Sequence, residues 1–130
     1  MKKLITLLVL TAGLFIAAAP VLAHHGRGAT YDMKKELQLK GTVSEVLWRN
    51  PHIAIFVDVK DDSGKVTKWV IEHSNITTLT MQGYGRTTLK PGQEVTAFVH
   101  PGSDGSPAGL CMKIVFADGK QIFQRNAGVD

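Results

Sequence analysis

The sequence has little cysteine and no long apolar run. Cys111 is the only cysteine among 130 residues, so no internal disulfide can form and the fold must rest on a hydrophobic core. The longest apolar run, residues 4–19, has 16 residues, fewer than the roughly 20 that a transmembrane helix needs.

Sequence patterns typical of catalysis are also missing. The chain has no Gly-x-Ser-x-Gly, no glycine-rich phosphate loop, no Cys-x-x-Cys and no His-Glu-x-x-His. Because no nucleophile or redox motif can be named, we expect a protein that is not an enzyme.

The first 23 residues have the pattern of a signal peptide. Lys2 and Lys3 precede the apolar run, and Val21 and Ala23 occupy the small-residue positions before a cleavage site. We expect cleavage before His24 and export to the periplasm, with an uncleaved anchor as the alternative. Removal of residues 1–23 takes away two lysines and no acidic residue, so the formal charge falls from +4 to +2. This small excess indicates no nucleic-acid partner, and the cleaved chain would have no membrane anchor.

From residue 30 to residue 123 the pattern is typical of short strands. Apolar and polar residues alternate between turns rich in Gly, Pro and Asp. Around Ser44 the apolar residues change parity, which predicts a bulge or bend in the first strand. The expected strands include 37–48, 52–59, 94–100, 110–116 and 120–123, with a short helix over 76–82.

Residues 61–65, Asp-Asp-Ser-Gly-Lys, indicate a three-residue hairpin loop closed by a left-handed glycine. With Asp61 opposite Lys65, Val57 faces Trp69 and apolar residues meet across the hairpin. A register tighter by one residue is the alternative, and it would bring His52 opposite His73 as a two-imidazole ligand pair.

Three strands, a short helix and two or three further strands follow one another in the order of the OB-fold. We therefore predict an all-β fold with one short helix, a small five- to six-stranded OB-like Greek-key barrel, with an open sandwich as the alternative. The domain would span residues 24–130, with a flexible N-terminal segment over 24–33.

The expected mature start carries two histidines that can bind a metal. The α-amine and the imidazole of His24 form a chelate, and His25 adds a second imidazole; such nitrogen-rich sets suit Cu(II). A loose, solvated terminus without metal is the alternative.

A second pair is expected within the barrel. In the preferred register His52 and Glu72 lie on one face, one diagonal step apart, and a carboxylate can fix the tautomer of an imidazole for metal binding. The alternative is a histidine that closes the Asn50-Pro51 turn through backbone hydrogen bonds. Cys111 is expected to be a small buried hydrophobe, with a Cu(I) thiolate as the alternative.

Several motifs together resemble a domain-of-unknown-function family of small exported bacterial proteins. The most specific of them is Trp-x-Asn-Pro-His at residues 48–52, and the His24-His25 start, residues 69–72 and residues 89–92 add to it. The resemblance implies a periplasmic, OB-like barrel without an established activity, and it singles out His52 and Glu72.

The sequence therefore predicts a periplasmic binding module. Its ligand would be a transition metal, with Cu(II) favoured, held by His24, His25, His52 and Glu72. The alternative is an accessory protein that binds a protein or oligosaccharide partner on the barrel face without a metal.

Overall fold

The computed structural model describes residues 30–125, which form six strands and one short helix. The elements are β1 (Leu37–Leu47), β2 (Ala54–Lys60), β3 (Val66–Glu72), α3 (Ile76–Met81), β4 (Glu94–Pro101), β5 (Ala108–Phe116) and β6 (Gln121–Ile122). This order confirms the predicted all-β fold with one short helix. Within the described range, no helix is long and apolar enough to cross a membrane.

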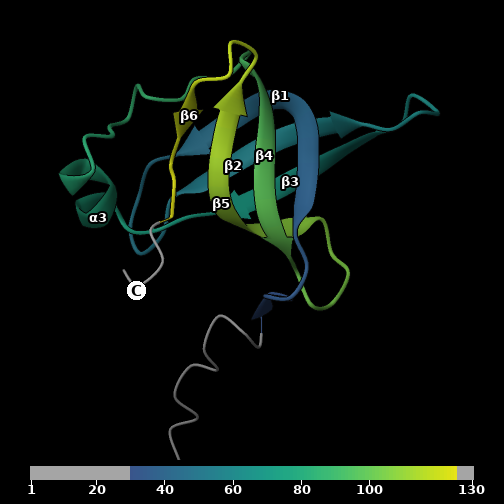
Figure 1. Ribbon diagram of the computed structural model, residues 1–130, viewed down its shortest axis with the longest axis horizontal. Helices are drawn as coiled ribbons and strands as arrows, with labels where there is room; N and C mark the ends of the chain where they lie inside the picture. Colours follow the sequence, from purple (N-terminus) through teal and green to yellow (C-terminus); the bar gives the residue numbers. More distant parts are fainter. Residues whose placement is uncertain (1–29, 126–130) are drawn as a thin grey trace, which may run out of the picture.

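Five of the strands close into a barrel (Figure 1). β1 pairs antiparallel with β2 and β4, β2 with β3, and β4 with β5. The ring is closed by a short parallel pairing between the end of β3 and the start of β5, in which Glu72 is opposite Leu110. β6 pairs antiparallel with the C-terminal end of β5, at Ile114 and Val115. The result is the predicted OB-like barrel, and the closed ring rules out the open sandwich.

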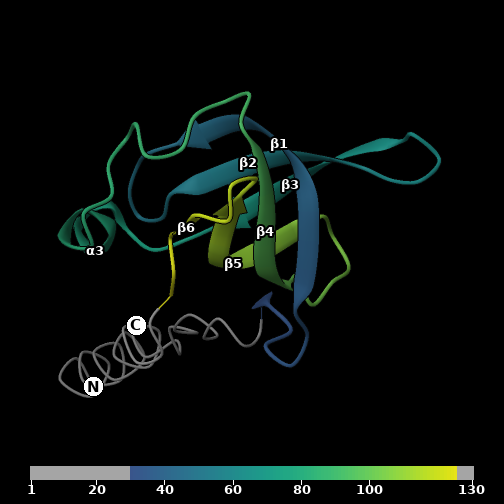
Figure 2. The ribbon, with the colours of Figure 1, turned by 45° about the horizontal axis from the view of Figure 1, so that its top comes forward.

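β1 takes part in two sides of the barrel because it bends. Its register with β2 shifts between Val43 and Glu45, which confirms the bulge predicted near Ser44. Figure 2 shows the first half of β1 beside β4 and the second half beside β2. Just before the bulge, Gly41 allows β1 to approach β2 closely, since a Cβ there would lie 2.4 Å from the carbonyl oxygen of Asp58.

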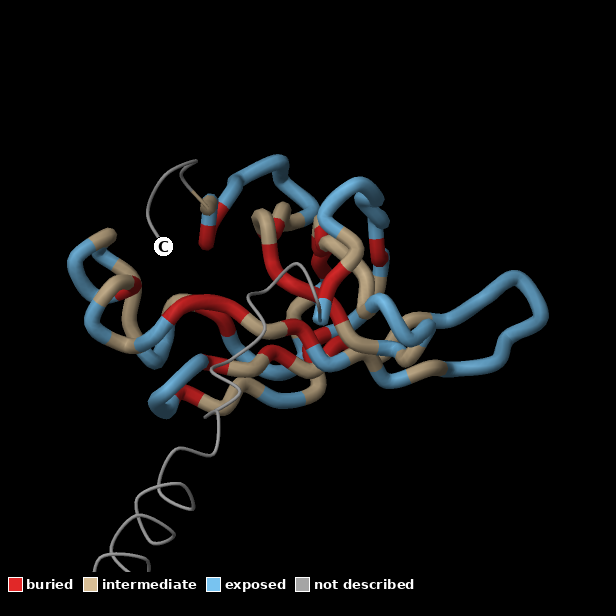
Figure 3. Tube along the Cα trace, turned by 90° about the horizontal axis from the view of Figure 1, so that it is seen from below, coloured by how far each residue is buried: buried red, intermediate tan, exposed pale blue. Residues whose placement is uncertain are grey.

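The β2–β3 hairpin has the predicted turn and register. Asp61 N donates to Lys65 O at 2.9 Å, and Gly64 closes the loop with a φ of +87°. The Ser63 hydroxyl, followed by backbone amides, holds the pKa of the Asp61 carboxyl below its usual value. Val57 is opposite Trp69, so the tighter register is wrong. The tip of the hairpin projects from the barrel and is exposed (Figure 3).

The barrel interior is filled by aliphatic residues, and one end is closed by aromatic rings. Ile55, Val57 and Ile71 have no exposed surface, as their parity predicts. At the end near α3, the ring of Phe123 lies 4.9 Å from that of Tyr84 and 6.5 Å from that of Trp48. These tryptophan and tyrosine rings therefore belong to the core of the fold.

Candidate functional site

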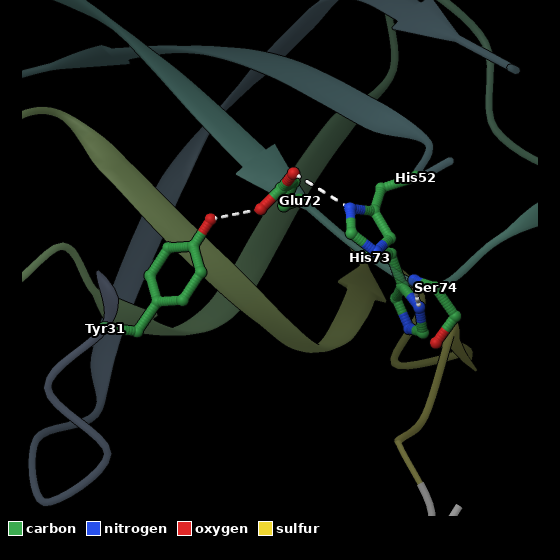
Figure 4. Close-up of polar contacts among 5 residues, drawn as sticks. All are labelled: Tyr31, His52, Glu72, His73 and Ser74. Atoms are coloured by element: carbon green, nitrogen blue, oxygen red, sulfur yellow. Dashed lines mark hydrogen bonds and ion pairs between the residues drawn. The ribbon is translucent and has the colours of Figure 1, made fainter. Parts of the chain in front are cut away.

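His52 and Glu72 lie side by side on the outside of the barrel (Figure 4). His52 is in the β1–β2 loop and Glu72 ends β3, and the distance from His52 Nδ1 to Glu72 Oε1 is 3.2 Å. Their side chains are 42 % and 39 % exposed. The predicted His-carboxylate contact is therefore present, and solvent reaches both groups.

The β1–β2 loop is fixed to the chain that follows β3. Ile53 N donates to Ser74 O at 3.2 Å, and His73 N donates to Ile53 O at 3.1 Å. The Asn50 side chain accepts a hydrogen bond from Ile76 N at the start of α3. Because both ends of the loop are held in this way, His52 has a defined position beside Glu72. These Asn50 and Ile53 contacts, not the His52 ring, fasten the turn.

Tyr31 is a third member of the site, which the sequence analysis missed. Its hydroxyl donates to Glu72 Oε2 at 2.5 Å, the short end of the range for a hydroxyl that donates to a carboxylate. Tyr31 falls in the segment 24–33 that we expected to be flexible, although residues 30–32 are paired with the end of β4. Tyr31 forms a bridge with Gly102, and Asp32 N donates to Pro101 O at 2.8 Å.

His73 lies on the opposite side of β3 from Glu72 and is 2 % exposed. Its Nε2 donates to Phe123 O at 2.8 Å, and its Nδ1 accepts from Ser74 N at 2.6 Å. The two-imidazole pair of His52 and His73 is therefore wrong, because the true register sends the two rings to different faces. His73 has a structural role that links β3 to the C-terminal part of the fold.

The other candidate groups are engaged elsewhere. His100, at the end of β4, is half-buried and its Nδ1 lies 2.6 Å from Lys35 O. Cys111 is fully buried, and desolvation raises the pKa of its thiol to about 12, with a smaller opposite effect from Arg125. A protonated, buried thiol fits the packing role predicted for Cys111 and is a poor metal ligand.

His24 and His25 lie outside the described residues. Between residues 30 and 125, no group of three or more His, Cys, Asp or Glu side chains is placed to hold a metal ion. His52 and Glu72 thus supply two potential donors on this face.

Comparison with known proteins gives one finding on family. The sequence profile of a family described as a family of unknown function (DUF6152) matches residues 12–113, a span that includes Tyr31, His52 and Glu72. No curated protein and no solved structure matches the chain.

Proposed function

The chain belongs to the family of unknown function DUF6152, and we propose that it is an exported, periplasmic binding module that holds Cu(II). The site would be formed by the α-amine and imidazole of His24, the imidazole of His25, and His52 with Glu72. The observation that carries the proposal is the exposed contact between His52 Nδ1 and Glu72 Oε1. A histidine held by a carboxylate through one ring nitrogen presents its other nitrogen to a metal.

The attachment of residues 30–32 supports a shared site. Tyr31 is hydrogen-bonded to Glu72, and six residues lead from His25 to Tyr31. A chain of that length spans at most about 20 Å. We propose that this short connection brings the expected mature terminus to His52, so that three imidazoles and one amine would bind a single ion. Nitrogen sets of this kind bind Cu(II) more tightly than Zn(II).

Intact-mass measurement of the exported protein, with and without Cu(II) or Zn(II) under native conditions, tests the proposal. We expect a mature chain that begins at His24 and binds one Cu(II). A variant with one additional alanine before His24 keeps every side chain but moves the α-amine one residue away from the His24 imidazole. It should lose most of the copper affinity with an unchanged metal-free Tm; equal affinity in the two proteins would contradict the N-terminal chelate.

The affinity should also fall as the solution is acidified. Amine and imidazole ligands must lose protons before they bind a metal, so copper binding should weaken steeply from about pH 7 to about pH 5. Isothermal titration in two buffers of different ionisation enthalpy measures the protons released. Copper binding without proton release would contradict a site built from these ligands.

A second function is favoured by the surface next to Glu72. On the outer face of the barrel Phe56 is paired with Val70, and Val70 and Val66 are exposed. The Asp58–Lys68 ion pair lies between these apolar side chains. The face of the second and third strands is where OB-folds bind oligosaccharides. If the protein binds no metal, an accessory module for a protein or oligosaccharide partner is the better account.

A further inference from the structure

Three side chains from distant parts of the sequence form a continuous hydrogen-bonded row. Tyr31 donates to Glu72 Oε2, and Glu72 Oε1 lies 3.2 Å from His52 Nδ1 (Figure 4). Each oxygen of the carboxylate therefore has its own partner. Within residues 30–125, Nε2 of His52 has no hydrogen-bond partner, and the ring is 42 % exposed.

The Tyr31 end of the row is buried and bridged to the backbone of Gly102. Tyr31 is 6 % exposed, and Leu110 of β5 is 2 % exposed, although neither belongs to the core cluster inside the barrel. In the sheet, Leu110 is opposite Glu72 on one side and His100 on the other. A residue bridged to Gly102 that reaches Glu72 must cross this part of β5. Tyr31 is thus buried on the outer face of the barrel, next to the backbone pairing of residues 31 and 32 with the end of β4.

This arrangement determines the state of the His52 ring. An ionised carboxylate can only accept hydrogen bonds, so a contact with Glu72 requires the proton to be on Nδ1 of the neutral ring. Nε2 then carries the lone pair, on a side chain that is 42 % exposed. The Tyr31 hydroxyl, by donating to the second oxygen, restricts rotation of the carboxylate and keeps Oε1 directed at His52.

We infer that Tyr31 is a positioning residue for the metal site, acting on His52 through Glu72. The inference rests on the proposed function and refines it. Glu72 serves as a hydrogen-bond acceptor and not as a ligand, and Nε2 of His52 is the donor atom that the barrel offers to the ion. The competing arrangement places the ion between His52 Nδ1 and Glu72 Oε1, in place of the shared proton.

The first measurement needs no metal. Nitrogen-15 NMR of the mature protein at about pH 8.5, where exposed imidazoles are neutral, reports which ring nitrogen of His52 carries the proton. We expect the Nδ1–H tautomer in the natural protein and a shift toward Nε2–H in Tyr31→Phe. The matched control is Tyr84→Phe, because Tyr84 is the only other tyrosine in the sequence and packs against Phe123. It should leave the His52 tautomer unchanged.

Tyr31→Phe keeps the backbone bridge to Gly102 and the aromatic ring, so the variant should fold. Far-UV circular dichroism and Tm check this. An Nε2–H tautomer in the natural protein, or no change in a folded Tyr31→Phe protein, would overturn the inference.

The second measurement uses Cu(II) alone as the probe. Loss of an outer hydrogen-bond partner of a metal-binding histidine lowers metal affinity about 10- to 100-fold, and we expect about tenfold for Tyr31→Phe, with no change for Tyr84→Phe. Glu72→Gln keeps an oxygen that accepts from Nδ1 but removes the carboxylate. Its electron paramagnetic resonance spectrum should equal that of the natural protein, since the ligand set is the same.

A changed spectrum in Glu72→Gln, with signs of a lost oxygen ligand, would overturn the inference in favour of the ion between His52 and Glu72 while leaving the proposed copper function intact. If the natural protein binds no copper but the NMR results hold, the proposed function fails and the positioning of His52 by Tyr31 stands.

Discussion

Replacing His73 with phenylalanine should destabilise the barrel strongly, whereas the same change at His52 should not. The substitution preserves a ring of similar shape but leaves Phe123 O and Ser74 N without these hydrogen bonds, and both residues are buried. A buried polar group that loses its partner costs about 1–3 kcal/mol. The expected loss for the two groups together is about 2–6 kcal/mol, a large part of the roughly 5–15 kcal/mol that keeps a small domain folded.

The assay is urea unfolding of the mature protein followed by tryptophan fluorescence. His52→Phe should lower the free energy of unfolding by less than about 1 kcal/mol, because its exposed contact with Glu72 contributes little to stability. His73→Gln retains an N–H that reaches toward Phe123 O and should fall between the natural protein and His73→Phe. Equal losses for His73→Phe and His52→Phe would refute the structural role assigned to His73.

Further predictions concern other parts of the fold. Gly41→Ala should destabilise the barrel by about 1–3 kcal/mol, because the added Cβ would lie 2.4 Å from a carbonyl oxygen of β2. In the control Gly85→Ala the added Cβ meets nothing within 4 Å, so the free energy of unfolding should change by less than about 0.5 kcal/mol. Urea unfolding measures both changes. Asn75→Ala should cost about 1 kcal/mol, since the Asn75 side chain caps α3 by accepting from Thr78 N at 2.8 Å, and a loss below 0.2 kcal/mol would contradict that role. Burial raises the pKa of Cys111 to about 12, so a thiol reagent at pH 8 should label the folded protein only as fast as it unfolds. Because that pKa lies above the value of 9.0 in the unfolded chain, stability should fall as the pH rises from about 9 toward 12.

The β2–β3 hairpin and the bend in β1 could be predicted because their causes are local. Residues 61–65 contain the turn chemistry that sets the register, and the alternation of apolar residues fixes which side faces inward. The change of parity near Ser44 required a bulge, since one strand cannot otherwise bury both halves. The same register predicts that Glu72 lies near His52, so the His52–Glu72 contact could be predicted from the sequence.

Tyr31 and the role of His73 were not visible, because their partners are distant in the chain. Tyr31 is 41 residues from Glu72 in the sequence. It pairs with Gly102 through a single bridge, which is too short to show an alternation of apolar and polar residues. The inward parity of His73 followed from the register, but its partner Phe123 is 50 residues away. No local pattern reports a contact of that separation.

The candidate site depends on the closure of the barrel. Glu72 is positioned by the parallel pairing of β3 with β5, and Leu110 in that pairing lies on the outer face that Tyr31 crosses. Parallel pairing of distant strands is the step that local sequence favours least. The Tyr31–Glu72–His52 row therefore exists only once β3 and β5 have met. It follows that a substitution that opens this seam should disconnect Tyr31 from His52 before it unfolds the β2–β3 hairpin, whose turn and register are local.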